Sequence, residues 1–346
     1  MIYPQFIMPG QTLGICAPSA GVGDKLEAFD DSLETLHHTG LETFETASVR
    51  NAALPSAPAE ERGDEFNQLF ADSNIAAVIS ASGGDYNIEM LPFIDQDTVS
   101  ANPKWFAGYS DPTSIEMLLT TKLDIASIYG VNAGAWDWHP MHEYHHNAID
   151  ILMGKIPVQH SYDMWAGSGF DDENGRYNMD TPVAWTLLRP WEGEFVEDDH
   201  LDVSGRLIGG CIDVIDWMIG TPYEDLTGFT ERYNKDGFIW FFDNFELNPM
   251  QLMYAANKMK MMGLFDNAKA VIFGRTCFPR EATDLDYLEQ LERVFCGKDS
   301  HGNELRVPVI WNADIGHTKP SFTLINGSMG RLQYEYGRAK LSMELR

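Results

Sequence analysis

The sequence predicts an α/β fold in which an N-terminal, mainly parallel sheet flanked by helices precedes a second α/β domain, with the active site between them. Short apolar runs alternate with amphipathic segments, as strands alternate with helices in such folds. Many of these runs end in small or polar residues, and ligands gather at the carboxyl ends of parallel strands. The 346 residues, 44% of them hydrophobic, are enough for two domains with sizeable cores.

The first domain is expected over residues 1–155. Its expected strands are short, apolar and bounded by loop residues, and they cover 12–17, 41–46, 75–80, 105–108 and 125–129. Two helices are expected because apolar residues recur on one face, namely Leu26, Phe29, Leu33 and Leu36 before Gly40, and then Phe66, Leu69 and Phe70. Between them, residues 51–61 have the composition of a loop.

A connecting segment over 156–204 precedes the second domain, expected over 205–346. Residues 165–181 are polar and rich in glycine, so we expect a lid or binding loop there. The second domain should hold strands at 238–242, 270–273 and 307–311, the last at a sheet edge. Pro249 should begin a helix that carries Leu252, Met253, Ala256 and Met259.

The charge balance restricts the partners of the chain. There are 52 acidic and 24 basic residues, a formal net charge of −28, which disfavours nucleic acids and anionic membrane surfaces. No apolar run approaches the roughly 20 residues of a membrane span, and the N-terminus lacks the pattern of a signal peptide. The four cysteines are far apart, which fits a reducing cytoplasm. We therefore expect a cytoplasmic protein.

Ser110 lies in a sharp turn between the expected strand 105–108 and a helix. A nucleophile elbow has this strand–turn–helix shape and leaves the next backbone N–H able to stabilise an oxyanion. The match to G-x-S-x-G is partial, because Pro112 replaces the closing glycine. The alternative interpretation is that Ser110 and Asp111 only cap the helix.

A second motif offers a different chemistry. Residues 142–146 form a complete H-E-x-x-H pattern, in which His142 and His146 would bind zinc and Glu143 would act as general base. The pattern is short and no third ligand is marked, so a solvated helix in a connecting segment is the preferred interpretation.

Three residues could together form a catalytic triad. Ser110, Asp243 and His317 each follow an expected buried strand. A nucleophilic serine needs a base within hydrogen-bond reach, and the base needs an orienting carboxylate. The order serine, acid, histidine is one that such triads adopt. His317 is equally compatible with an ordinary surface position.

Several motifs, in order along the chain, resemble those of the LD-carboxypeptidase and microcin-immunity family of serine peptidases. They are Pro9–Ser19, Glu61–Asp64, Ser82–Asp85, Gly108–Asp111, Gly205–Gly210, Gly220–Tyr223, Ile272–Arg275 and Asp314–His317. The resemblance implies Ser110 as nucleophile, His317 as general base, and the backbone N–H groups of Gly84 and Asp111 as the oxyanion hole. It implies no metal and no cofactor.

Two departures from the family pattern matter. Asp243 stands where the family has a glutamate, so the acid is one methylene shorter, and Glu246 is the alternative acid. Residues 82–87 lack the arginine of true LD-carboxypeptidases and are more similar to the microcin-immunity branch. The segment with Trp165, Trp185 and Trp191 is also similar to that branch, in which an aromatic side chain would stack on a nucleotide-like group.

These observations predict a homodimeric serine amide hydrolase that acts on a murein peptide or a peptidyl-nucleotide conjugate. Two alternatives remain open at this point. One is a binding protein that keeps the fold without catalysis, and the other is a zinc hydrolase that uses His142, Glu143 and His146.

Overall fold

A computed structural model describes residues 1–171, 176–277 and 286–346, and the chain forms two compact units. Unit 1 comprises Met1–Pro157, Gly220–Glu224 and Thr323–Gly327. Unit 2 comprises Val158–Ile219, Asp225–Phe322 and Ser328–Arg346. The segment 156–204, expected to connect the domains, therefore lies in unit 2 from Val158 onward.

Unit 1 contains a six-stranded sheet with strand order β17-β5-β4-β3-β1-β2. The strands are β1 (Thr12–Cys16), β2 (Glu42–Glu45), β3 (Ile75–Ser80), β4 (Trp105–Gly108), β5 (Ser127–Tyr129) and β17 (Leu324–Asn326). The pairings among β1 to β5 are parallel, as predicted, whereas β17 joins β5 in antiparallel orientation. The carboxyl ends of β3 and β4 are thereby neighbours at one edge of the sheet.

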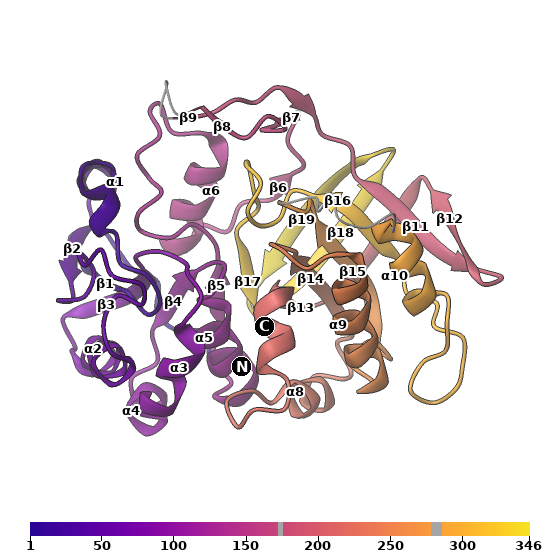
Figure 1. The fold of residues 1–346 in the computed structure, drawn as a ribbon, viewed down its shortest axis with the longest axis horizontal. Helices are drawn as coiled ribbons and strands as arrows, with labels where there is room; N and C mark the ends of the chain where they lie inside the picture. The colour runs from indigo at the N-terminus through magenta and orange to yellow at the C-terminus, as the bar shows by residue number, and fades with distance from the viewer. Residues whose placement is uncertain (172–175, 278–285) are drawn as a thin grey trace. The chain divides into compact units, whose positions relative to one another are not determined.

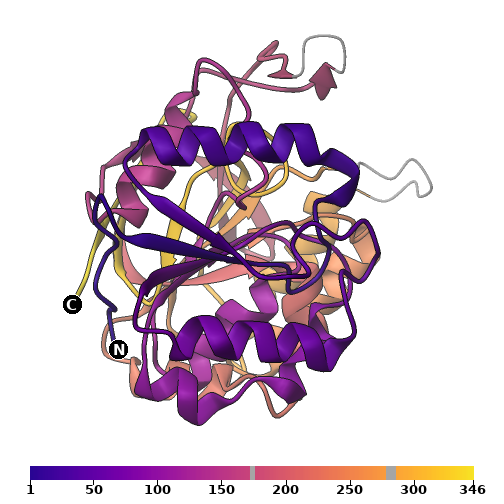
Figure 2. The same ribbon diagram turned by 90° about the vertical axis from the view of Figure 1, so that its left-hand side faces the viewer.

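Helices cover both faces of this sheet. Figure 2 shows α1 above the strands and α2 below them. Phe29, Leu33 and Leu36 of α1 are buried, as predicted, but Leu26 at its first position is 41% exposed. The α-helices of unit 1 are α1 (Leu26–His38), α2 (Ala59–Ala71), α3 (Asn87–Met90), α4 (Gln96–Ala101), α5 (Thr113–Met117) and α6 (Glu143–Leu152). Shorter turns are η1 (Gly23–Lys25), η2 (Leu91–Phe93) and the π-helical η3 (Leu118–Lys122).

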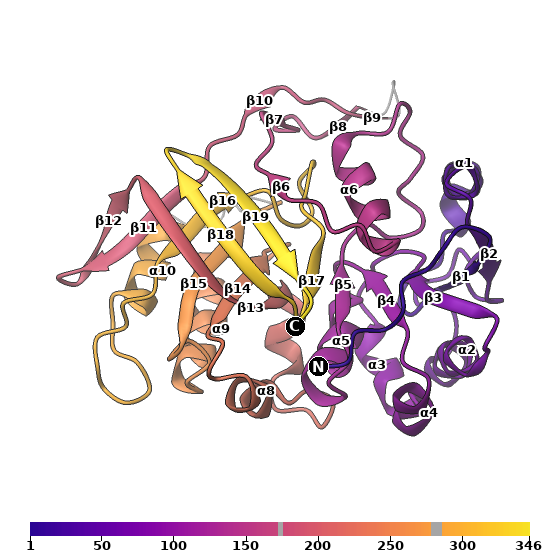
Figure 3. The same ribbon diagram turned by 180° about the vertical axis from the view of Figure 1, so that it is seen from behind.

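Unit 2 contains a nine-stranded mixed sheet with the order β12-β11-β16-β15-β14-β13-β18-β19-β6. Its strands are β6 (Gln159–His160), β11 (Thr186–Trp191), β12 (Glu194–Asp198), β13 (His200–Cys211), β14 (Phe238–Asp243), β15 (Ala268–Gly274), β16 (Val309–Ala313), β18 (Met329–Glu335) and β19 (Arg338–Glu344). Neighbours from β13 to β16 are parallel. The antiparallel hairpin of β18 and β19, yellow in Figure 3, extends the sheet beside β13.

The expectation that 307–311 forms an edge strand is wrong. β16 pairs with β15 on one side and with β11 on the other, so it lies inside the sheet. β11 comes from the segment that was expected only to connect the domains. A pairing between strands more than a hundred residues apart leaves no local pattern in either strand, which explains the error.

The helices of unit 2 pack on its sheet, with α9 and α10 side by side (Figure 1). They are α7 (Ile212–Met218), α8 (Leu226–Arg232), α9 (Pro249–Met261) and α10 (Tyr287–Phe295). Pro249 begins α9, as predicted, and Asn248 and Gln251 form a capping box there. Across the described ranges, no helix is both long and apolar enough to span a membrane.

The expected lid over 165–181 is described only in part, since residues 172–175 lie outside the described residues. Two short ladders flank that gap: β7 (Met164–Trp165) pairs with β10 (Thr181–Pro182), and β8 (Phe170–Asp171) pairs with β9 (Arg176–Tyr177). A role as a lid stays a prediction.

Candidate active site

Ser110 occupies the turn between β4 and α5 in a strained backbone conformation. Its φ is +72°, in the left-handed region that serine rarely adopts. Its carbonyl accepts a 3.0 Å hydrogen bond from the N–H of Thr113, the first residue of α5. A non-glycine residue persists in this region only where its surroundings enforce it, and such residues cluster at functional sites. The strand–turn–helix shape required of a nucleophile elbow is therefore present.

The helix-cap interpretation of Ser110 and Asp111 is wrong. Pro112 occupies the N-cap position of α5, and its side chain makes no capping hydrogen bond. The Asp111 carboxylate instead accepts hydrogen bonds from the Ser19 hydroxyl at 2.5 Å and from the Asn87 N–H at 2.8 Å. Both donors belong to other loops, so the carboxylate connects segments that are remote in sequence.

The two glycines that follow β3 pack closely around Ser110 and Ser19. A Cβ at position 83 would lie 3.1 Å from Ser110 Oγ, and a Cβ at position 84 would lie 2.3 Å from Ser19 Oγ. Gly84 has a φ of +142°, which disfavours other residues as well. Close packing thus requires glycine where the resemblance places an oxyanion loop.

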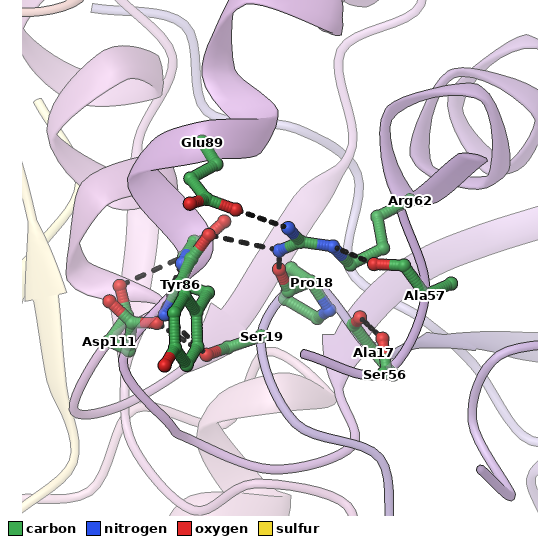
Figure 4. A network of polar contacts seen from close by, with 10 residues as sticks. Ala17, Pro18, Ser19, Ser56, Ala57, Arg62, Tyr86, Glu89 and Asp111 are labelled. Carbon is green, nitrogen blue, oxygen red and sulfur yellow. Dashed lines mark hydrogen bonds and ion pairs between the residues drawn. The ribbon is translucent and has the colours of Figure 1, made fainter. Parts of the chain in front are cut away.

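Burial raises the pKa of Asp111 to about 6, although its hydrogen bonds with Ser19 and Asn87 oppose the shift. The side chain is almost fully buried. Figure 4 shows the surrounding network, in which Arg62 lies on the far side of the same loops. The Arg62 guanidinium donates to the carbonyls of Pro18, Tyr86 and Ala57 and pairs with Glu89 at 3.5 Å.

In unit 2 the structure brings Asp243 and His317 together. Oδ2 of Asp243, at the end of β14, lies 2.7 Å from Nδ1 of His317, in the turn after β16. The Asp243 side chain is completely buried, while that of His317 is 12% exposed. Oδ1 of Asp243 also accepts from the backbone N–H of His317 at 3.3 Å. Because Nδ1 faces the carboxylate, Nε2 is the ring nitrogen that can act as a base.

Gly316 allows this close approach. Its φ is +94°, and a Cβ on it would lie 1.9 Å from Oδ1 of Asp243. The backbone of the histidine turn therefore lies directly against the shorter acid, which compensates for the methylene that aspartate lacks relative to glutamate. Sequence reasoning listed Gly316 in a motif but assigned it no role.

Glu246, the alternative acid, lies in the turn after β14 and is exposed. Asp213, which sequence reasoning missed, organises that turn by accepting the backbone N–H groups of Phe245 and Glu246, each at 3.0 Å. Burial raises the pKa of Asp213. The Phe245 ring packs on the His317 ring with centroids 4.3 Å apart, so the turn fixes one face of the imidazole.

The tryptophans of the 156–204 segment have different surroundings. Trp185 is buried and donates through Nε1 to Asp314 at 3.1 Å. Trp165 packs against the Arg275 guanidinium, whose carbon lies 4.8 Å from the ring centroid, and Trp191 is 64% exposed. Trp185 therefore contributes to the interior of unit 2.

Two buried cations accompany the histidine turn. Arg275, at the end of β15, pairs with Asp314 at 2.7 Å and donates to the Thr318 hydroxyl at 3.3 Å. Lys319 is 5% exposed and donates to the Gly316 carbonyl at 3.4 Å. Burial lowers the pKa of Lys319. Two basic side chains are thus buried beside His317, within a chain of strongly negative net charge.

The H-E-x-x-H segment has a structural explanation. His142 precedes α6 as its N-cap, and its Nδ1 accepts from the Tyr144 N–H at 3.3 Å. His142 lies at the N-cap with an extended backbone, outside the helix on which the zinc motif places both of its histidines. His145 is buried and contacts the Ala135 carbonyl at 3.1 Å. Within the described part of the chain, no three metal-ligating side chains of His, Cys, Asp or Glu form a cluster.

Comparisons with known proteins identify the family. Residues 13–130 match the model of the LD-carboxypeptidase N-terminal domain, and residues 204–332 match that of the C-terminal domain. The microcin C7 self-immunity protein MccF of Escherichia coli is 27% identical over 78% of this chain and 74% of its own.

Solved structures show the same fold. MccF in complex with aspartyl sulfamoyl adenosine superposes with a TM-score of 0.76 at 22% identity, over 100% of both chains. The MccF-like protein of Bacillus anthracis gives 0.79 at 19% identity over 100% of both chains. Muramoyltetrapeptide carboxypeptidase of Oxalobacter formigenes gives 0.71 at 22% identity, over 96% of this chain and 98% of its own.

The two domain models follow one another in the expected order, and together they match most of the chain. The α/β fold with two domains, predicted from the sequence, is confirmed. The chain belongs to the LD-carboxypeptidase family of serine peptidases.

Proposed function

We propose that the chain is a serine hydrolase that cleaves an amide bond next to a free carboxyl group, with Ser110 as nucleophile, His317 as general base and Asp243 as the orienting acid. The observation that carries this proposal is the 2.7 Å contact between the buried Asp243 carboxylate and Nδ1 of His317. A buried carboxylate in this position fixes the tautomer and stabilises the imidazolium that forms during the reaction.

In the proposed reaction, Nε2 of His317 removes the proton from Ser110 Oγ as the oxygen attacks the amide carbonyl. The N–H groups of Gly84 and Asp111 would hold the resulting oxyanion. His317 then returns the proton to the leaving amine, and a water molecule, deprotonated by the same histidine, releases the acyl group from Ser110. The mechanism requires His317 Nε2 to reach hydrogen-bond distance of Ser110 Oγ.

The chemistry of unit 2 supports a substrate with a free carboxylate. Arg275 pairs with Asp314, and the Lys319 amine donates to the Gly316 carbonyl in the histidine turn. A net charge of −28 repels small anions, so a local cation is needed to bind one. Two of the similar proteins fit this class: one is named muramoyltetrapeptide carboxypeptidase, and the other was solved in complex with aspartyl sulfamoyl adenosine.

The non-catalytic alternative was motivated by Asp243 in place of glutamate. The close approach at Gly316 supports the catalytic proposal, because it brings the shorter acid into contact with the histidine. Zinc chemistry receives no support from His142, which caps a helix. A homodimer stays a prediction for sedimentation analysis.

The test is a liquid-chromatography screen of two substrate classes, murein tetrapeptides and aminoacyl- or peptidyl-adenylate analogues, each alone and with its free carboxyl group amidated. We expect hydrolysis in at least one class and a large loss on amidation. Lys319→Met should raise KM for the free-carboxyl substrate and leave the amidated one unchanged. Lys260→Met is the matched control, since Lys260 also donates to a backbone carbonyl in unit 2 and burial lowers its pKa. No turnover in either class would contradict the proposal.

A further inference from the structure

We propose that the Asp111 side chain is a positioning residue, which acts through Ser19 to hold the Gly83–Gly84 loop against Ser110. The inference rests on the proposed function, in which the backbone of Gly84 and Asp111 binds the oxyanion. It assigns a separate task to the carboxylate, which nothing in that mechanism uses. Figure 4 shows the side chains that carry the argument.

One oxygen of Asp111 joins three segments of unit 1. Its Oδ2 accepts from Ser19 Oγ at 2.5 Å, in the loop after β1, and from the N–H of Asn87 at 2.8 Å, at the start of α3. The same Ser19 hydroxyl accepts from the N–H of Tyr86 at 3.2 Å. The carboxylate therefore fixes both neighbouring loops from the residue that follows the nucleophile.

Ser19 transmits this restraint to the glycines. Its Oγ occupies the place where a Cβ of Gly84 would be, and the N–H of Ala20 donates to the Gly83 carbonyl at 3.0 Å. Gly83 in turn packs against Ser110. A displacement of Ser19 would move the glycine backbone, and a misplacement of about 1 Å in a catalytic site can cost about 100-fold in rate.

Arg62 also holds the segments that contain Ser19 and Asn87. Its guanidinium is buried and donates to the carbonyls of Pro18 and Tyr86, one residue before Ser19 and one before Asn87. The charged groups that face Asp111 are the exposed Asp85, which raises its pKa, and Arg62, with Glu89 beyond it.

Asp111 carries its charge at an energetic cost. The carboxylate is buried with no cation in direct contact in the network described, and burial raises its pKa to about 6. An ionised acceptor makes shorter and stronger hydrogen bonds than a neutral one. Replacing the carboxylate by a neutral amide in Asp111→Asn should therefore weaken both hydrogen bonds and loosen the loops that Asp111 holds.

Unit 1 offers a matched control pair. Ser48 and Glu65 are also a buried serine and carboxylate: Ser48 Oγ lies 2.5 Å from Glu65 Oε2, and the Ser48 N–H donates to Oε1 at 3.0 Å. This pair has the same chemistry but lies outside the three loops around Ser110. Its loss should reduce stability without moving the glycines.

The experiment compares Asp111→Asn and Ser19→Ala with Glu65→Gln and Ser48→Ala. We expect kcat to fall about 10- to 100-fold in the first two, with KM changed less than about threefold, because donors at an oxyanion act on the transition state. In a double-mutant cycle the two losses should not add, since both act on the same loop. The control variants should keep kcat.

Hydrogen–deuterium exchange provides a readout that needs no substrate. At pH 7.5, peptides that cover 18–21 and 84–88 should be less protected in Asp111→Asn and Ser19→Ala than in wild type. Glu65→Gln and Ser48→Ala should keep the wild-type protection of these peptides. Unchanged kcat and unchanged protection in both Asp111→Asn and Ser19→Ala would overturn the inference. Full activity of Ser110→Ala would instead overturn the proposed function, whatever the exchange data show.

Discussion

Gly316 lies so close to Asp243 that a single added methyl group at position 316 would occupy the position of the carboxylate, at 1.9 Å from Oδ1. The contact shows how closely the histidine turn approaches Asp243, at the position where the resemblance implies a glutamate. The backbone of the histidine turn lies against the Asp243 side chain. The N–H of His317 donates to Oδ1 of this side chain at 3.3 Å.

Gly316→Ala should therefore disable the pair. The new Cβ must displace Asp243 or the turn, and alanine at a φ of +94° costs about 1–2 kcal/mol in addition. We expect a loss of about 100-fold or more in kcat, by analogy with misplaced catalytic groups. Gly302→Ala is the control: its φ is +84°, with nothing within 4 Å of the added Cβ. Equal activity in the two variants, measured beside their melting temperatures, would contradict this interpretation.

If Asp243 rather than Glu246 is the acid, variants of these two residues should differ in kcat. Asp243→Asn should lower kcat by about four powers of ten, because an amide at that position favours the wrong histidine tautomer. Glu246→Gln should have less than about a threefold effect, since Glu246 is exposed and Asp243 contacts the ring. Steady-state kinetics of both variants decides the point, and the reverse order of losses would assign the acid to Glu246.

Asp111 should leave a signature in the pH dependence of stability. Its pKa is raised from 3.8 to about 6, so between these values the folded state binds a proton that the unfolded state does not. Stability from this group is thus greatest at low pH and is lost as pH rises, by at most about 1.4 kcal/mol per pH unit.

The stability of Asp111→Asn relative to wild type should accordingly increase from pH 4 to pH 6 and then level off. Urea denaturation at several pH values measures it. Glu65→Gln serves as the comparison for a buried carboxylate outside the loops. A difference between Asp111→Asn and wild type that stays constant over this range would show that Asp111 titrates normally.

Metal chelation should have no effect on activity. His142 caps α6, and the loss of such a cap typically costs about 1 kcal/mol, so His142→Ala should lower the melting temperature while kcat is kept. Glu143→Gln should be silent in both assays, because Glu143 is exposed. Stoichiometric zinc found by elemental analysis, with activity lost on its removal, would reverse this assignment.

The sequence predicted the positions of the candidate residues better than their contacts. Ser110, Asp243 and His317 each follow a buried apolar run, and strand ends are readable from local pattern. The partners of these residues come from elsewhere in the chain: Asp111 bonds with Ser19, and Asp213 supports the turn at Phe245. Hydrogen bonds between residues that are far apart in the chain produce no periodic pattern in the sequence.

The same distinction applies to the fold: the strands could be predicted from local pattern, and the long-range pairings could not. The parallel strands β1 to β5 were predicted from apolar runs followed by loop residues. The places of β11 beside β16 and of β18 beside β13 were not, because each pairing joins strands that are more than a hundred residues apart. The Asp111 side chain was misassigned as a possible cap because Ser-Asp-Pro is also a common helix start.

The central claim is that Ser110 is the nucleophile, and the most direct test is the turnover of Ser110→Ala beside wild type on the best substrate of the screen. Pro112, not Ser110, is the N-cap residue of α5, so we expect the variant to keep the melting temperature of wild type. We predict a fall in kcat of at least about four powers of ten, as for other triad serines. Turnover by Ser110→Ala within tenfold of wild type would contradict the account.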